Sequence, residues 1–205
     1  MAKLKFISLS RLIFLSLLSL FILAQPAIGH DAKIPAEPYP VMDGMGGDFT
    51  LQSTLGRPAS LSEFKGKVVL MFFGYTSCPD ICPIVLAKFN SIKQQLGPER
   101  AKMVQGLFVT VDSKRDTPEK LKAYLDYFDP KMVGFTGSVE DLMGVALKYG
   151  TVFFENEGTE ETGPLFAHGD YVYLIDDQGR LRELFNSETK VHNITHGVAS
   201  LLPAS

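Results

Sequence analysis

The two cysteines of the chain are four positions apart, in the segment Thr76-Ser77-Cys78-Pro79-Asp80-Ile81-Cys82-Pro83. The thiolate form of cysteine is both a nucleophile and a metal ligand. Three intervening residues in a proline-containing loop let the two sulfurs converge, so that they can bond to each other or share one soft metal ion. The spacing alone leaves a structural disulfide, a redox couple and a metal site open.

The elements around the cysteines place them where a ligand is expected. The residues before them, 67–75, are β-branched and aromatic, which is typical of a central parallel strand buried on both faces. A helix is predicted over 84–96, with Cys82 at its cap and Pro83 in its first turn, because the residue before a proline avoids helical geometry. Free N–H groups at a helix start lower the pKa of a thiol, whereas Asp80 opposes this.

The rest of the chain predicts an α/β protein with a thioredoxin-like fold. Strands are expected at 48–51, 103–111, 132–136, 171–176 and 181–185, and helices at 118–128, 138–149 and 190–202. Alternating units build a parallel sheet, and the terminal hairpin adds antiparallel strands, so the fold is a central mixed sheet flanked by helices. Asp116 is expected to cap its helix, and the glycine-rich, acidic segment 150–167 to form a mobile hairpin or loop.

The N-terminus predicts export. Residues 12–24 form an apolar stretch of roughly 13 residues, which is short for a spanning helix and typical of a signal peptide. We expect 1–29 to be a signal peptide cleaved before His30 or an N-terminal membrane anchor through residues 12–28. Residues 30–47 are rich in proline and glycine and are assigned to a linker, and 48–205 to the folded domain.

Composition narrows the class of protein. The chain has 205 residues, of which 45% are hydrophobic and 21% charged, as expected for one folded domain with a leader. The net charge is −3 and no basic run occurs, which excludes nucleic acid as a partner. An exported chain with two cysteines is not a miniprotein held together by disulfides.

Several separated motifs resemble the Sco/SenC family of copper proteins. They are Gly66-Lys67-Val68-Val69-Leu70, the segment from Gly74 to Pro83, Val111-Asp112-Ser113-Lys114-Arg115-Asp116-Thr117-Pro118, and His168 followed by Tyr173-Leu174-Ile175-Asp176. The similarity covers most of the chain from Gly46 onward. It implies a thioredoxin-like fold, copper binding as Cu(I), Cu(II) or both, and a role in assembling the binuclear copper centre of cytochrome c oxidase. The leader predicts a location outside the cytoplasm, in a bacterial periplasm, either soluble or tethered to the inner membrane.

The resemblance selects His168 as the third copper ligand beside Cys78 and Cys82. Two thiolates and one imidazole suit Cu(I) and can also bind Cu(II). We expect His168 in the loop that enters the strand beside the cysteine loop. The family pattern has Asp before this histidine and Ser after it, where this chain has Ala167 and Gly169. Loss of an orienting partner would weaken the site, unless Asp170 replaces it.

Other candidate ligands have simpler interpretations. His192 and His196 share one face of the last predicted helix, and a solvated face explains them better than a metal site. Met42 and Met45 are soft donors that could relay copper, although packing is the simpler account. His30 would chelate copper only as a new N-terminus.

Two acidic features also have simpler interpretations. Asp112 and Asp116 are interpreted first as turn and cap residues and second as partner contacts. Segment 155–161 is interpreted as a solvated acidic loop, placed so that it could gate the site or meet a partner.

Two functions follow from these residues. In the first, a metallochaperone holds copper and passes it to the copper-centre subunit of cytochrome c oxidase or to another cuproprotein. In the second, a thiol–disulfide oxidoreductase attacks with Cys78, resolves with Cys82 and is reset by a thiol reductant. A peroxidase acting through Cys78 is a distant third. We favour copper handling over catalysis, and His168 discriminates the two functions because disulfide exchange does not need it.

Overall fold

The computed structural model describes residues 39–203, so the predicted leader and the first half of the predicted linker lie outside the described residues. The strands are β1 (Thr50–Ser53), β2 (Pro58–Ser60), β3 (Val68–Gly74), β4 (Val104–Thr110), β5 (Val133–Thr136), β6 (Phe153–Asn156), β7 (Leu165–His168), β8 (Tyr171–Ile175) and β9 (Leu181–Asn186). The helices are the 3-10 turn η1 (Leu61–Phe64), α2 (Ile81–Leu96), α3 (Pro98–Ala101), α4 (Pro118–Asp126), α5 (Val139–Lys148) and α6 (Val191–Leu201).

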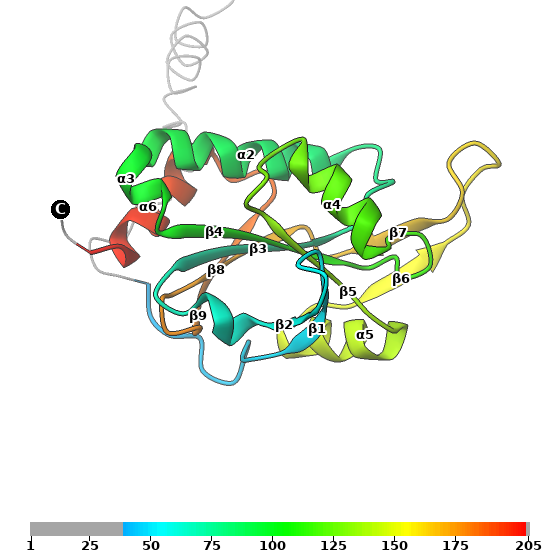
Figure 1. Cartoon of the computed structure of the whole chain (residues 1–205), viewed down its shortest axis with the longest axis horizontal. Coiled ribbons are helices and arrows are strands. Elements are labelled where there is room, and N and C mark those ends of the chain that lie inside the picture. The colour runs from blue at the N-terminus through cyan, green and yellow to red at the C-terminus, as the bar shows by residue number, and fades with distance from the viewer. Residues whose placement is uncertain (1–38, 204–205) are drawn as a thin grey trace, which may run out of the picture. The chain divides into compact units, whose positions relative to one another are not determined.

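Seven strands form one mixed sheet in the order β2-β1-β5-β4-β3-β8-β9. Strands β3, β4 and β5 are parallel, and β8 joins β3 in the antiparallel sense. Helices α2, α4 and α6 cover one face of this sheet and α5 covers the other (Figure 1). This is the mixed α/β architecture predicted from the sequence, with its C-terminal hairpin and last helix in place.

The central strands are buried on both faces, as their composition predicts. Every residue of β3 and of β4 is buried. Phe72 pairs with Phe108 across the two parallel strands, and their ring centroids are 6.4 Å apart. Two layers of helices exclude water from this pair of strands, so the ends of β3 and β4 are rigid supports for the loops that follow them.

The first strands differ from the expected pattern. The chain turns back after β1 at residues 54–57, and β2 pairs with β1 in the antiparallel sense. Gly56 has φ of 76°, a conformation that glycine adopts without strain, and the hydroxyl of Ser53 donates a hydrogen bond to the carbonyl of Arg57 at 2.7 Å. A tight hairpin therefore extends the sheet beyond β5, where a lone strand was predicted.

Helix α4 begins differently from the prediction. Its N-cap is Thr117, whose hydroxyl accepts a hydrogen bond from the backbone N–H of Lys120. Asp116 was expected to fill this role, but its side chain is fully buried and turned toward the cysteine loop. Because α4 starts with Pro118, the preceding threonine supplies the cap and leaves Asp116 free for a longer-range contact.

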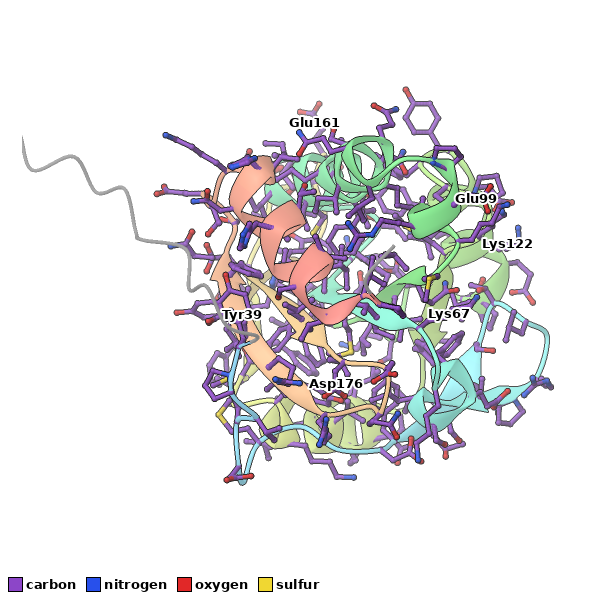
Figure 2. All side chains as sticks on the ribbon, turned by 90° about the vertical axis from the view of Figure 1, so that its left-hand side faces the viewer. Tyr39, Lys67, Glu99, Lys122, Glu161 and Asp176 are labelled. Carbon is purple, nitrogen blue, oxygen red and sulfur yellow. The ribbon has the colours of Figure 1, made fainter. Side chains whose placement is uncertain are left out.

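Residues 39–47, at the end of the predicted linker, pack on the domain. The buried ring of Tyr39 lies edge-on to Phe185, with centroids 5.8 Å apart, at the end of the molecule shown in Figure 2. Met42 and Met45 are partly buried against the core, which agrees with their interpretation as packing residues. Within residues 39–203 no helix combines the length and apolarity needed to cross a membrane.

Candidate metal centre

The cysteine loop connects the carboxyl end of β3 to the start of α2. Helix α2 begins at Ile81 with Asp80 at its N-cap, three residues earlier than predicted, so Cys82 lies inside the first turn and not at the cap. Pro83 is compatible with this position because the N–H of the third helical residue has no partner inside the helix. Both thiols are free; Cys82 is buried and Cys78 is partly exposed.

Gly74, the last residue of β3, lets the helix start approach the strand closely. A Cβ atom at this position would lie 2.8 Å from the sulfur of Cys82 and 2.9 Å from the ring of Phe108. Real side chains do not approach so closely, so the buried sulfur occupies space that only glycine leaves open.

Asp116 holds the other end of the cysteine loop. Its carboxylate, with no exposed surface, accepts hydrogen bonds from the backbone N–H of Thr76 at 2.9 Å, from the Thr76 hydroxyl at 2.5 Å and from the Thr110 hydroxyl at 2.7 Å. The ammonium of Lys120 lies 3.4 Å away and balances the charge. These bonds fix Thr76, two positions before Cys78, to Asp116, which lies 40 residues further along the chain, and through Asp116 to Thr110 at the end of β4.

His168 is the last residue of β7, not part of a loop as predicted. Its Nε2 atom lies 3.9 Å from the Cys82 sulfur, and its Nδ1 atom lies 2.9 Å from the carbonyl oxygen of Gly169. A carbonyl oxygen only accepts hydrogen bonds, so Nδ1 carries the proton and Nε2 presents its lone pair to the sulfurs. The ring is thus in the tautomer that a metal ligand needs.

Aromatic rings hold the imidazole in this orientation. Phe72 and Tyr75 both lie edge-on to it, with centroids 5.8 Å and 6.0 Å away. Asp170, considered as a substitute orienting residue, accepts a hydrogen bond from Ser187 at 2.7 Å. The carbonyl of Gly169 orients the ring instead.

The family's pattern of residues around this histidine would not fit here unchanged. A Cβ atom at Gly169 would lie 2.4 Å from the hydroxyl of Thr151, so a serine in that position requires Thr151 to move. Ala167 is exposed and leaves the outer face of β7 apolar beside the histidine.

The two thiols differ in acidity because of their surroundings. A hydrogen bond from Cys82, aided by backbone N–H groups of Asp80 and Cys82, lowers the pKa of Cys78 well below its ordinary value despite partial burial. The same hydrogen bond, together with burial, raises the pKa of Cys82. The backbone N–H groups at the helix start therefore act in the predicted direction, as a smaller cause than the hydrogen bond from Cys82, and the partly exposed Cys78 is the more acidic thiol.

A residue that the sequence analysis did not single out joins the two halves of the site. The guanidinium of Arg115 pairs with the buried carboxylate of Asp112 and donates hydrogen bonds to the carbonyls of Thr162, at 3.3 Å, and Pro164, at 2.5 Å. It thereby ties the end of β4 to the β6–β7 hairpin, which carries His168.

The same guanidinium also lies over two aromatic rings, those of Tyr75 and Phe166, at 5.9 Å from each centroid. These rings lie 5.4 Å apart, one on the cysteine loop and one on the hairpin. The motif that contains Arg115 was a usable signal, but its reach to the hairpin depends on the tertiary fold.

The three candidate ligands are neighbours in an open arrangement. Over residues 39–203 no three or more His, Cys, Asp and Glu side chains stand at the spacing of a formed metal site, so Cys78, Cys82 and His168 would have to move closer together to hold an ion. The side chains of His192 and His196 are exposed on α6, in agreement with a solvated helix face. His30 lies outside the described residues.

Comparison with known proteins confirms the resemblance. The family model described as SCO1/SenC matches residues 39–203. An SCO2-like protein of Rickettsia felis is 38% identical over 143 residues, which are 69% of each chain, and the protein sco1 of Schizosaccharomyces pombe is 32% identical over 76% of this chain and 60% of its own.

Solved structures show the same relationship. Copper-bound ScoI of Bradyrhizobium japonicum superposes with a TM-score of 0.69 at 32% identity, covering 77% of this chain and 99% of its own. Copper-bound yeast Sco1 superposes with a TM-score of 0.66 at 30% identity, covering 78% and 92%. By its sequence match and by its fold, the chain belongs to the SCO1/SenC family.

Proposed function

We propose that this protein is an extracytoplasmic copper chaperone that serves the binuclear copper centre of cytochrome c oxidase. Copper is its cargo, held by the sulfurs of Cys78 and Cys82 and by Nε2 of His168. The observation that carries the proposal is the approach of His168 Nε2, from the hairpin, to within 3.9 Å of the Cys82 sulfur at the helix start that follows Cys78. Membership of the SCO1/SenC family and the copper-bound relatives support the identity of the metal.

The donor set fits copper. Thiolate sulfur and imidazole nitrogen are soft to intermediate donors, and together they suit Cu(I) and tolerate Cu(II). The lone pair of Nε2 needs no tautomer change to bind the ion, since Nδ1 already donates to the carbonyl of Gly169. Cys78 is partly exposed, so an acceptor's ligands can reach the ion while Cys82 and His168 still hold it. Stepwise exchange of ligands then moves the ion without releasing it to water.

The test is a Cu(I) competition titration against a chromophoric chelator, on the reduced full chain. We expect one tightly held ion in the parent protein and an affinity at least about a hundredfold lower in Cys78→Ser, Cys82→Ser and His168→Ala, because each variant removes a direct ligand. His192→Ala is the matched control, since that histidine is exposed on α6. If His168→Ala bound copper as well as His192→Ala, the three-ligand site would be refuted.

The difference in exposure between the two cysteines favours a second candidate function, thiol–disulfide exchange. The accessible Cys78 thiolate would attack a partner disulfide, form a mixed disulfide and release one partner thiolate. Cys82 would then attack the Cys78 sulfur, which releases the second partner thiol and leaves a Cys78–Cys82 disulfide. A thiol reductant must supply two electrons to reset the pair. His168→Ala would retain this activity while losing copper, so the same variant separates the two functions.

A further inference from the structure

We propose that the hollow beside His168, together with the acidic tip of the β6–β7 hairpin, is the face on which a copper-accepting protein docks. The partner would present an apolar rim around its own metal ligands and lysine or arginine side chains beyond that rim. The proposal rests on the proposed chaperone function and specifies the partner surface that this function needs.

The hollow borders the residue that is the candidate metal ligand. It has a volume of about 480 Å³ and lies between the end of α5, the segment that leads into β6, and the outer face of β7. His168 is part of its wall, as are Leu147, Val152 and Phe154. A protein seated in this hollow therefore contacts the residue that would release copper.

Large apolar side chains surround the hollow and are exposed. Phe154 is 61% exposed and Leu147 is 60% exposed, and Val152 is exposed beside them. The strand pairing explains the exposure: Phe153 pairs with His168 and is buried, so the next residue, Phe154, points outward. Aromatic and aliphatic side chains gathered in this way mark a protein-interaction surface.

The tip of the hairpin adds a negative charge next to this apolar surface. Glu155 pairs with Lys114 at 2.9 Å. Glu157, Glu160 and Glu161 have no cation within ion-pair distance among residues 39–203. Three unpaired carboxylates favour a partner with a basic rim and repel an acidic one. Such charge complementarity changes the association rate and the specificity more than the affinity.

Copper transfer requires the acceptor to reach a donor that is not fully buried. The Cys82 sulfur is buried against Gly74 of the central strand, so an acceptor cannot approach it through the sheet. The partly exposed donors, Cys78 and His168, are the ones that an acceptor can reach. Ligand exchange needs the acceptor's donors within bonding distance of the ion, and the apolar hollow adjoins His168, one of these two donors.

The first experiment measures binding of the full copper-loaded chain to the apo copper-centre domain of oxidase subunit II from the same organism. We expect Phe154→Ser and Leu147→Ser each to weaken binding at least about tenfold, because each removes an apolar side chain that the bound partner would bury. Tyr127→Ser is the matched control, because Tyr127 is 86% exposed at the end of α4, on the opposite face of the sheet. In the chelator titration, all three variants should bind copper with the same affinity as the parent protein.

A charge variant tests the hairpin tip separately. Glu157, Glu160 and Glu161 changed together to glutamine should slow association several-fold at low salt and converge with the parent at high salt. If the association rate of this variant depended on salt as strongly as the parent's does, the proposal that the partner has a basic rim would be refuted.

The possible failures are distinguishable. A parent that binds no copper refutes the proposed function itself. If the parent binds copper but does not associate with the copper-centre domain, that domain is refuted as the partner that docks on this face. If Phe154→Ser and Leu147→Ser bind that domain as tightly as Tyr127→Ser, the proposed docking face is refuted.

Discussion

Replacement of Arg115 by lysine should weaken copper binding with little effect on the fold. Lysine keeps a positive charge near the buried carboxylate of Asp112, so that the charge stays compensated. A single ammonium cannot also reach the two hairpin carbonyls and stack on the rings of Tyr75 and Phe166, as the planar guanidinium does. The perturbation therefore loosens the hairpin that carries His168 while leaving both cysteines in place.

The size of the effect follows from the contacts that are lost. A charge-assisted hydrogen bond is worth about 1.5–3 kcal/mol when well shielded. The Arg115 side chain is 25% exposed and its hairpin carbonyls are exposed, so we discount each of the two bonds to about 1 kcal/mol. A loss of about 2 kcal/mol in the positioning of His168 corresponds to a roughly thirtyfold fall in copper affinity.

Two assays test this prediction. Chelator competition gives the copper affinity of Arg115→Lys, and hydrogen exchange of the hairpin amides reports whether β6 and β7 open more often. Lys190→Arg, at the cap of α6, is the control variant, because it substitutes one cationic residue for the other at a position away from the site. Unchanged copper affinity together with unchanged hairpin exchange would refute the account of Arg115 as the tie between the two halves of the site.

Three further predictions concern the supports of the site and the pH dependence of stability. Gly74→Ala should lower the free energy of unfolding in urea by about 1–3 kcal/mol, because the new methyl group would overlap the Cys82 sulfur. Asp116→Ala should lower it by about 3 kcal/mol or more, since one buried N–H and two hydroxyls lose their acceptor. Burial raises the pKa of Asp129, but the hydrogen bonds from the Lys93 ammonium and the Lys131 backbone N–H, together with the positive charges of both lysines, outweigh it and the net pKa is lowered. That carboxylate therefore stabilises the fold above its unfolded pKa of about 4, and this contribution is lost as the pH falls through the lowered folded value.

Each of these predictions has a control or a contradicting result. Gly144→Ala, at a glycine with open space around a new methyl group, should not destabilise the protein; equal losses at Gly74 and Gly144 would contradict the overlap argument. Asp116→Ala should also lower copper affinity, since the cysteine loop loses its anchor, and a loss of stability alone would indicate a purely structural role. Lys93→Met should remove much of the acid-dependent loss of stability measured by urea unfolding between about pH 5 and pH 2. An unchanged pH profile in that variant would contradict the assignment to Asp129.

Local patterns in the sequence determined the elements of the fold and half of the candidate site. Composition identified β3 and β4 as buried strands, because a strand covered on both faces can hold few polar residues. The cysteine spacing and Pro83 located the thiols at a helix start, since proline restricts its neighbours within one turn. These signals act over a few residues, and no tertiary contact is needed to express them. His168 was chosen by resemblance to the family, because a single histidine has no second ligand at a characteristic distance in the sequence that would mark it as a metal ligand.

Only the tertiary structure decided which distant residues meet. The Cys82–His168 approach joins positions 86 residues apart, and it depends on β8 lying beside β3, a pairing that no local pattern specifies. Likewise Asp116 had the sequence context of a helix cap, yet the fold turned its carboxylate inward to the cysteine loop. The tautomer of His168 and the reach of Arg115 also depend on side-chain geometry across elements. Local propensity selects the elements, whereas burial and long-range hydrogen bonds determine how the side chains between them are used.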